Sequence, residues 1–379
     1  CYSKLNQVYF ISIPSNQART RLNLLFRAHD QESKSKDMEG IKLSTFATRC
    51  VLLTTCYALL TACSQTDETE VLSVSIGFVP TVEAQTRGID FTKDNLTSLG
   101  VLAYLTQGNS FNVLSSTPNF MYNQEVTKAT GASTWEYTPT KFWPTNSNDK
   151  ITFFAYAPHN AKGLTLPAAT DRGYPSFTYQ VQAAEAAQID LLVCTPLMNQ
   201  TYATNSGKVK FVMNHALTKI AIYVKNNDNV SEKTITAFSI RGVKSGTLTF
   251  QSLDTDSKGF EWNYPSSVPM ETFTTTITNF SVPINSATEK KLLSTFFLLP
   301  NGSGNTFSIT YKYTGANGTE TIVLNNQPLP SSDKWKPGAL VNYIVSIDTK
   351  SGVSVTVNSN PAWGNGGAET VDGSDMETR

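Results

Sequence analysis

The feature that most constrains how this chain can fold is a long series of short segments in which apolar and polar residues alternate. Residues 71–78, 177–181 and 353–357 show the pattern most clearly. Such alternation is the period of a β-strand with one buried and one exposed face, because successive side chains point to opposite faces. Turn residues such as 315–318 (Gly-Ala-Asn-Gly) separate the segments and are typical of hairpins. Many short strands at this spacing predict an all-β protein built from antiparallel β-sandwiches.

The strand-like segments form two series, one on each side of a polar, turn-rich stretch at residues 197–208. A break of this kind favours a domain boundary. We therefore predict an N-terminal β-sandwich domain at residues 71–200, a C-terminal one at 206–363, and a flexible tail at 364–379. The helix-like piece at 183–187 is too short to be stable alone. Further strands are expected at 99–105, 151–156, 189–193, 209–213, 219–224, 235–240, 247–250, 292–299, 307–313, 321–324 and 343–347.

The charge composition argues against two classes of partner. The chain has 30 Lys and Arg against 30 Asp and Glu, so its formal net charge is zero. A chain whose positive and negative charges balance has no excess of basic residues with which to bind nucleic acid or an anionic membrane surface. Charged residues make up only 16% of the chain, while 20 Phe and 15 Tyr are present. A composition with few charged and many aromatic residues is typical of the exposed strand faces of an extracellular β protein.

The N-terminal part has the pattern of a bacterial secretion signal. Residues 1–37 show neither a clear period nor a motif, and we interpret them as a non-native or upstream extension, with Met38 as the initiator. Residues 38–62 are predicted to be a signal peptide, because Lys42 and Arg49 precede an apolar stretch too short to span a bilayer.

The signal ends in Leu-Thr-Ala-Cys63, which resembles a lipobox. We predict that Cys63 becomes the lipidated N-terminus and that its acyl chains anchor the protein in the outer membrane. The alternative is a plain cleaved signal or a buried apolar helix. Residues 63–70 would form an acidic tether, either a surface-export signal or a solvated linker.

The remaining candidate chemistry is sparse. No phosphate loop, dinucleotide fingerprint, nucleophile elbow, His-Glu-x-x-His or Cys-x-x-Cys motif occurs. We therefore predict no catalytic residues, no metal and no cofactor. Cys194 has no plausible disulfide partner once Cys63 is engaged. His215 and Asp190 are interpreted as structural residues, and residues 254–259 as a plain turn rather than a calcium loop.

Several pieces in a shared order resemble the fimbrillins of Bacteroidia, which build type V pili. The resemblance covers most of residues 63–363, downstream of the lipobox. Its pieces are residues 135–144 (WEYTPTKFWP), 150–158 (KITFFAYAP), 188–193 (QIDLLV), 211–220 (FVMNHALTKI), 297–300 (FLLP), 335–338 (WKPG) with Tyr343, and 361–363 (PAW).

The resemblance implies two transthyretin-like β-sandwich domains. It also implies that the chain is a pilus subunit that is assembled on the cell surface. In the family, a surface protease cuts after an Arg and removes the first strand, and a strand from a neighbouring subunit fills the groove. The matching position here is Arg87 in Thr-Arg-Gly. The implied partners are other pilin subunits and an Arg-specific surface protease, and the implied location is the fimbrium at the outer membrane.

The residues themselves support a removable strand at 71–79. One face of this segment is uniformly apolar and is expected to plug a core groove, and the chain is expected to leave the sheet at Pro80. The plug residues are Leu72, Val74, Ile76 and Phe78. The tail beyond Trp363 has little strand character, so the donor is expected in the final hairpin. The candidate donor residues are Val341, Tyr343, Val345, Ile347, Val353, Val355 and Val357.

Two functions from different classes stay open at the level of the sequence. One is a pilus subunit, either in the stalk or as a tip or accessory adhesin if the final hairpin is locked in the core. The other is a monomeric surface lipoprotein that binds a glycan or another host or bacterial surface ligand. An aromatic platform for the second function would come from Trp135, Tyr137, Phe142 and Trp143. We expect these aromatics to be core residues instead, and likewise Trp335, Tyr343 and Trp363.

Overall fold

The computed structural model describes residues 73–82, 95–253, 258–284, 290–315, 317–330, 333–348, 352–360 and 377–378. The contacts divide the chain between Val71 and Leu72. All of the described residues lie in the second unit, Leu72–Arg379.

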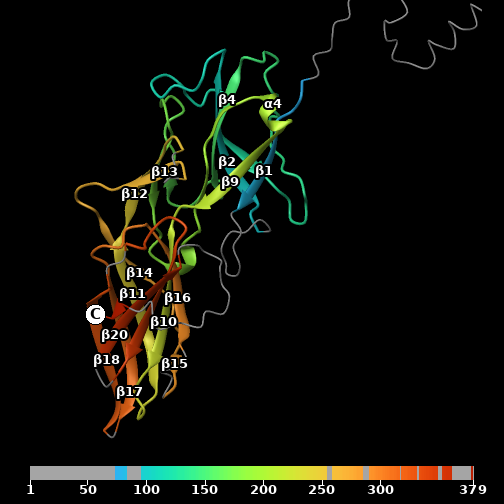
Figure 1. Cartoon of the computed structure of the whole chain (residues 1–379). Helices are drawn as coiled ribbons and strands as arrows, with labels where there is room; N and C mark the ends of the chain where they lie inside the picture. Colours follow the sequence, from blue (N-terminus) through green and yellow to red (C-terminus); the bar gives the residue numbers. More distant parts are fainter. Residues whose placement is uncertain are drawn as a thin grey trace, which may run out of the picture. The chain divides into compact units, whose positions relative to one another are not determined.

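The first sheet has seven strands and contains the long apolar runs of the first half of the chain (Figure 1). Its strand order is β1-β9-β7-β4-β2-β3, and β8 also pairs with β4. The bounds are β1 (Gly77–Val82), β2 (Ser98–Thr106), β3 (Met121–Thr127), β4 (Lys150–Ala157), β7 (Leu192–Cys194), β8 (Leu197–Gln200) and β9 (Lys208–His215). The central strands β2 and β4 are buried along nearly their whole length, which explains why they read as continuous apolar runs.

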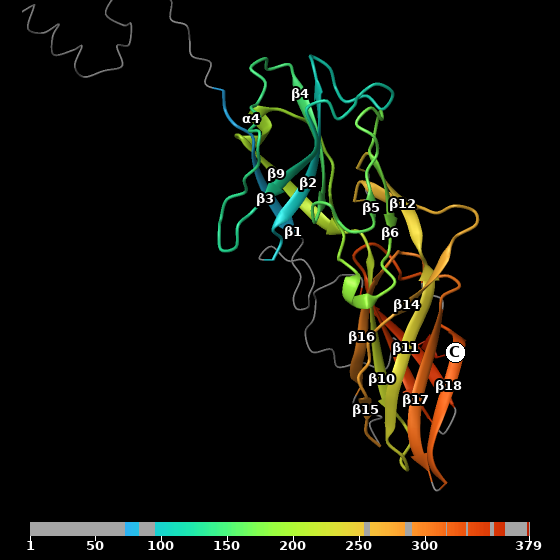
Figure 2. The same ribbon diagram turned by 180° about the vertical axis from the view of Figure 1, so that it is seen from behind.

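A four-stranded sheet covers one face of the first sheet (Figure 2). Its order is β13-β12-β6-β5, with β5 (Leu164–Thr165), β6 (Ser176–Gln180), β12 (Ser245–Phe250) and β13 (Phe260–Asn263). The aromatic rings of the two inner faces meet: Phe154 of β4 lies 5.1 Å from Phe250, and Tyr156 lies 5.5 Å from Phe177. Together the two sheets form a β-sandwich.

Two five-stranded sheets form the second sandwich. One has the order β14-β11-β17-β18, with β15 also pairing with β11, and the other has the order β16-β10-β19-β20-β21. Their inner faces meet at Phe238 of β11 and Phe296 of β16, whose ring centroids are 6.5 Å apart. The bounds are β10 (Thr218–Asn226), β11 (Lys233–Val243), β14 (Met270–Thr274), β15 (Phe280–Val282), β16 (Lys291–Leu298), β17 (Thr306–Gly315), β18 (Gly318–Pro328), β19 (Leu340–Ile347), β20 (Val353–Asn360) and β21 (Glu377–Thr378).

The all-β prediction is confirmed. The helical pieces of the described chain are short: α4 (Tyr202–Asn205), whose N-cap is Thr201, and the 3₁₀ helix η2 (Glu185–Ala187). Among the described residues no helix is long and apolar enough to cross a membrane. The transthyretin-like topology stays a prediction.

Three strands that the predicted domain limits assign to the second domain belong, by their pairing, to sheets of the first sandwich. The division into residues 71–200 and 206–363 puts β9, β12 and β13 in the second domain. In the structure β9 pairs with β1 and β7, and β12 pairs with β6 as well as with β13. Pairing partners far apart in the sequence are chosen by tertiary contacts, which periodicity does not encode. The division itself stays a prediction.

Candidate functional site

The site that the sequence singles out lies around β1, at one edge of the first sheet (Figure 1). β1 runs parallel to β9, in a register from Gly77 opposite Lys208 to Val82 opposite Met213. β9 is in turn paired with β7 on its other side. Removal of β1 would therefore leave β9 as a new edge with a row of unpaired backbone groups.

The prediction that the chain leaves the sheet at Pro80 is wrong. β1 continues through Pro80, which is buried and lies opposite Phe211. A proline lacks the N–H that a central strand needs, but an edge strand tolerates it where that N–H would face away from the ladder. The proline is thus compatible with β1 because β1 is an edge strand.

Phe78 anchors β1 in an aromatic groove. Its side chain is buried and stacks on Phe211 of β9, with ring centroids 5.6 Å apart and planes within 7° of parallel. Tyr137 and Phe153 approach it edge-on at 5.2 and 6.1 Å. Edge-on and offset contacts are the favoured aromatic geometries, so the groove is shaped for a large apolar side chain at this position.

A second segment covers the other side of the chain just before and at the start of β1. The Ile76 N–H donates to the Lys141 carbonyl oxygen, and the Trp143 N–H donates to the Val74 carbonyl oxygen, each at 2.9 Å. The Tyr137 hydroxyl donates to the Ile76 carbonyl oxygen at 2.8 Å and accepts the Lys141 N–H at 3.2 Å. Burial raises the pKa of Tyr137, which keeps the hydroxyl protonated as a donor. Residues 74–77 are therefore held on two sides.

The predicted plug residues do not all point inward. Ile76 and Phe78 are buried, whereas Val74 is 38% exposed. The expected uniformly inward face is thus wrong at Val74, because the buried face begins at Ile76 and continues at Pro80. Leu72 lies outside the described residues, as do Cys63 and Arg87.

The predicted donor residues lie on two strands with different surroundings. β19 is an internal strand between β10 and β20. Its candidates Val341, Tyr343, Val345 and Ile347 are all buried. β20 lies nearer the edge and is followed in its sheet only by the short β21. On β20, Val353 and Val355 are half-buried, and Val357 is buried.

The four aromatics considered for a ligand platform do not share one exposed face. Trp143 is buried and its ring lies edge-on to Phe153 at 6.1 Å, while Phe142 is 46% exposed. Tyr137 packs on Phe78. Trp135 is half-buried and lies under the Lys128 ammonium group, 5.6 Å from the ring centroid. Three of the four therefore serve packing, as expected for core residues.

The other residues considered for chemistry have structural surroundings. His215 Nδ1 lies 2.8 Å from Asp190 Oδ1, and both side chains are buried. Sequence reasoning missed this pair, which is separated by 25 positions. Cys194 is buried and its Sγ accepts the Ala155 N–H at 2.9 Å. Burial raises the pKa of this thiol to about 12. In the described part of the chain no three His, Cys, Asp or Glu side chains come close enough to hold a metal ion.

Trp335 and Tyr343 are packing residues, as predicted. Both are buried, and the Trp335 Nε1–H donates to the Tyr343 hydroxyl at 2.9 Å. That hydroxyl donates to the Pro330 carbonyl oxygen at 3.1 Å. Trp363 lies outside the described residues.

The fold and the site together define a class of protein: paired β-sandwiches in which a strand near the N-terminal end occupies a sheet edge over an aromatic groove. Comparison with known proteins agrees with this. The profile of the fimbrillin-like family matches residues 86–361, well over half of the chain. The chain belongs to the fimbrillin-like family.

Two relatives show how far the similarity extends. The chain is 28% identical over 354 residues to fimbrium subunit Fim1C of Phocaeicola vulgatus, covering 79% of this chain and 92% of that protein. A crystal structure of a fimbrial protein from Bacteroides vulgatus superimposes with a TM-score of 0.59 at 22% identity, covering 76% of this chain and 99% of that structure. The second match supports the fold alone.

Proposed function

We propose that this chain is a structural subunit of a fimbrium on the bacterial cell surface, that it polymerises by strand exchange, and that it is not an enzyme. The observation that carries the proposal is the seating of β1, an edge strand whose Phe78 occupies a groove formed by Phe211, Tyr137 and Phe153. Membership of the fimbrillin-like family supports the same function. The partners are other fimbrial subunits.

Export and activation would precede polymerisation. The chain travels as a lipoprotein anchored in the outer membrane through Cys63, and an Arg-specific surface protease cuts after Arg87. The cut lies beyond the end of β1 at Val82, so it separates both the lipid anchor and β1 from the rest of the chain. Loss of covalent linkage makes β1 replaceable by a strand from another subunit.

The energetic reason for exchange is the groove that β1 leaves behind. Its vacancy exposes the aromatic rings that now cover Phe78, and each 100 Å² of apolar area returned to water costs about 2.5 kcal/mol. It also exposes the edge of β9. A strand with alternating apolar side chains satisfies both the groove and the backbone, as in β-strand addition generally.

β20 is the better donor of the two predicted strands. It alternates perfectly from Val353 to Val357, and Val353 and Val355 are only half-buried, while Val357 is buried. Withdrawal of β19 would break two ladders and expose four buried side chains, whereas withdrawal of β20 breaks its pairing with β19 and the short contact with β21. Use of β20 as a donor makes the chain a stalk subunit, and a hairpin that stays closed makes it a tip or accessory subunit.

Treatment of the full chain with an Arg-specific protease tests the polymerisation. We expect cleavage after Arg87, followed by a ladder of multimers on an SDS gel run without boiling. Arg87→Ala should block both. Complete cleavage that leaves only monomers would contradict the proposal.

A peptide experiment tests the donor. A fluorescent peptide of residues 352–360 should bind to the cleaved protein and not to the uncleaved one, because the groove is occupied until β1 is released. The same peptide with Val355→Asp is the matched control and should not bind. Equal binding of both peptides would rule out β20 as the strand that fills the groove.

A further inference from the structure

β18 presents an open sheet edge. It has 11 residues, Gly318–Pro328, and it stands at the end of its sheet, next to β17. Within the described residues β17 is the one strand that pairs with it. Its regular ladder runs from Gly318 to Leu324 and ends at a bulge, where Asn326 has a φ of 52°. On the side that faces away from β17 no further described strand pairs with this stretch, so its outward residues Thr319, Thr321 and Val323 can take part in a new ladder.

Most other long edges of the described chain are covered or interrupted, while β20, which pairs with β21 only at Thr356 and Val357, is the donor strand proposed above. Residues 141–143 cover the start of β1, and β1 contains Pro80. Along β14, the Thr274 N–H donates to the Ala183 carbonyl oxygen at 2.8 Å. The ladder of β3 is interrupted at Asn123, whose φ is 48°. The remaining edges are short or, like β16, capped by side chains.

The cap on β16 shows how side chains close part of a sheet edge in this protein. The Thr295 N–H donates to Glu185 Oε1, and the Phe297 N–H donates to Gln188 Oε1, each at 2.8 Å. Two acceptor side chains of the η2 segment thus occupy the positions that the carbonyls of another strand would take. β16 also carries Lys291, a charge of the kind that discourages edge pairing.

The regular part of β18 lacks these protections. From Gly318 to Leu324 it contains no Lys, Arg or Pro, and Glu320 is its single charge. Ile322 and Leu324 pack against the core, while Thr319, Thr321 and Val323 face outward, with Val323 55% exposed. β-Branched outward residues such as these pair well with another strand.

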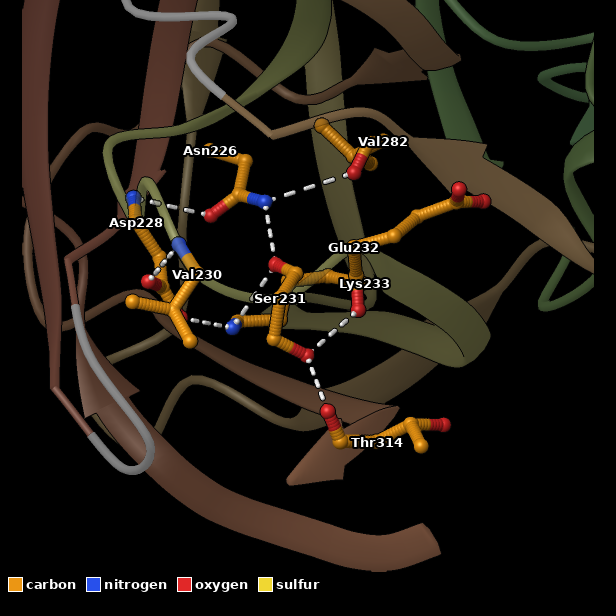
Figure 3. Close-up of polar contacts among 8 residues, drawn as sticks. All are labelled: Asn226, Asp228, Val230, Ser231, Glu232, Lys233, Val282 and Thr314. Carbon is orange, nitrogen blue, oxygen red and sulfur yellow. Dashed lines mark hydrogen bonds and ion pairs between the residues drawn. The ribbon is translucent and has the colours of Figure 1, made fainter. Parts of the chain in front are cut away.

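The hairpin that carries this edge is held by several contacts at its turn end (Figure 3). The Ser231 hydroxyl donates to the Thr314 carbonyl oxygen of β17 at 2.9 Å. The buried Lys233 ammonium lies 4.9 Å from the centre of the Tyr313 ring. Across the turn, the hydroxyls of Thr314 and Thr319 are 3.1 Å apart. An edge already ordered in this way loses little conformational entropy when a partner binds.

From the open and preordered edge, which carries no charge on its outward residues, we propose that β18 pairs antiparallel with β18 of a second copy of this chain, joining two sheets laterally. A two-fold axis perpendicular to the sheet keeps inward side chains opposite inward ones, so the axis passes midway between the two copies of one residue. Thr321 is the middle residue of the regular stretch from Gly318 to Leu324, so an axis at Thr321 pairs the whole stretch. Thr321 then faces Thr321 of the second copy, and Thr319 faces Val323.

In this register no two like charges lie directly opposite one another. Glu320 faces Ile322 of the second copy, so the two Glu320 carboxylates are not directly opposed. Lys312 lies beside Thr321 on β17. The two copies of Lys312 would be separated by three strand spacings, about 14 Å, which exceeds the screening length at physiological salt. This step rests on the proposed function above. In a polymer each subunit would present one such edge, so two polymers could form many weak β18 pairings at once and bind each other with higher avidity.

Cysteine substitution tests the register. The background is the full chain with Cys1, Cys50, Cys56 and Cys63 replaced by Ser, in which the remaining Cys194 is buried. We expect Thr321→Cys to form a disulfide-linked dimer under mild oxidation, because directly opposed strand residues lie within disulfide reach.

Two matched controls lie on the same exposed face. Thr319→Cys alone and Val323→Cys alone should stay monomeric, since each lies about 14 Å from its own copy in this register. A mixture of these two variants should form the mixed dimer. Absence of the Thr321→Cys dimer, or equal cross-linking of all three single variants, would overturn the proposal.

Sedimentation equilibrium of the uncleaved chain supplies a second measurement. Thr321→Lys places two ammonium groups opposite one another and should weaken dimerisation by roughly tenfold or more. Leu114→Lys, which removes an exposed side chain far from this strand in the sequence, should leave dimerisation unchanged. Arg87→Ala should also leave it unchanged, so lateral pairing and strand exchange can fail independently. Equal association of the Thr321→Lys and Leu114→Lys variants would refute pairing through β18.

Discussion

At the scale of single residues, Phe78 contributes most visibly to the seating of β1, because three aromatic rings surround it. We expect Phe78→Ala to lower the free energy of unfolding by about 3–5 kcal/mol, the range for a large buried aromatic. Val79→Ala on the opposite face is the matched control and should change it by less than about 0.5 kcal/mol. Urea titrations of both variants provide the measurement. Similar losses for the two would show that Phe78 is not buried as described.

The sequence indicated the role of some buried residues better than that of others. Trp335 and Tyr343 were predicted to pack, and they do, because large aromatics beside apolar strands have few alternatives. Lys233 gave no such signal, since a lysine at the start of a strand is ordinarily exposed. Its burial depends on two acceptors in the β10–β11 turn (Figure 3) and on the Tyr313 ring of β17, and no spacing rule encodes this combination.

Lys233 is buried with a specific set of partners. Its ammonium group contacts the Asp228 carboxylate and donates to the Ser231 carbonyl oxygen at 3.1 Å. The hydrogen bond from Lys233 holds the pKa of Asp228 below its usual range. The turn is further fixed by Asn226, which donates to the Ser231 carbonyl oxygen at 2.9 Å and accepts the Asp228 N–H at 3.0 Å.

Replacement of Asp228 should therefore destabilise the protein in a pH-dependent way. We expect Asp228→Asn to cost about 3 kcal/mol at pH 7, since the buried ammonium loses its counter-charge. The folded pKa of Asp228 lies below its unfolded value of about 3.9, so the stabilisation is present above that value and is lost as pH falls through the folded pKa. Wild type and variant should thus converge in stability in strong acid. Denaturant titrations from pH 7 to pH 2 would show this, and a constant gap would contradict it.

At the scale of elements, the positions of most strands follow from alternation and turn chemistry, whereas their partners do not. The segments at 99–105, 151–156 and 353–357 all fall within observed strands. The parallel pairing of β1 with β9 was not predicted, because residues 130 positions apart in the chain meet only through the tertiary fold, as Thr81 and Phe211 do. The continuation of β1 through Pro80 was missed for the same reason, since a proline is acceptable only when the strand is known to lie at an edge.

The η2 segment provides an element-scale prediction. Removal of both caps by Glu185→Ala and Gln188→Ala leaves two backbone N–H groups of β16 without their acceptors. We expect the amide hydrogens of Thr295 and Phe297 to exchange faster in this variant. The neighbouring Phe296 lies opposite Ile220 of β10 and serves as the internal control. Unchanged exchange at Thr295 and Phe297 would show that the caps do not protect the edge.

At the scale of the whole molecule, sequence reasoning placed the division between its two strand series near residues 197–208, but the described strands interlock across that stretch. β6 pairs with β12 from Ser176 opposite Thr249 to Gln180 opposite Ser245. The Trp262 Nε1–H donates to the Ala216 carbonyl oxygen at 2.7 Å. In the chain, β12 and β13 of the first sandwich lie between β11 and β14 of the second. The sandwiches are therefore joined at β9–β10, β11–β12 and β13–β14 rather than through one flexible linker, which favours unfolding as a single unit.

This coupling predicts a single cooperative unfolding transition. Trp143 and Trp335 are buried, one in each sandwich, and report on the two separately when the protein is labelled with 5-fluorotryptophan. We expect their folded ¹⁹F signals to disappear at the same urea concentration. Thr247→Pro on β12, which lies between β13 and β6, removes a ladder hydrogen bond in a central strand and should separate the two midpoints. Two distinct midpoints in the unsubstituted chain would instead show that the sandwiches unfold as independent domains.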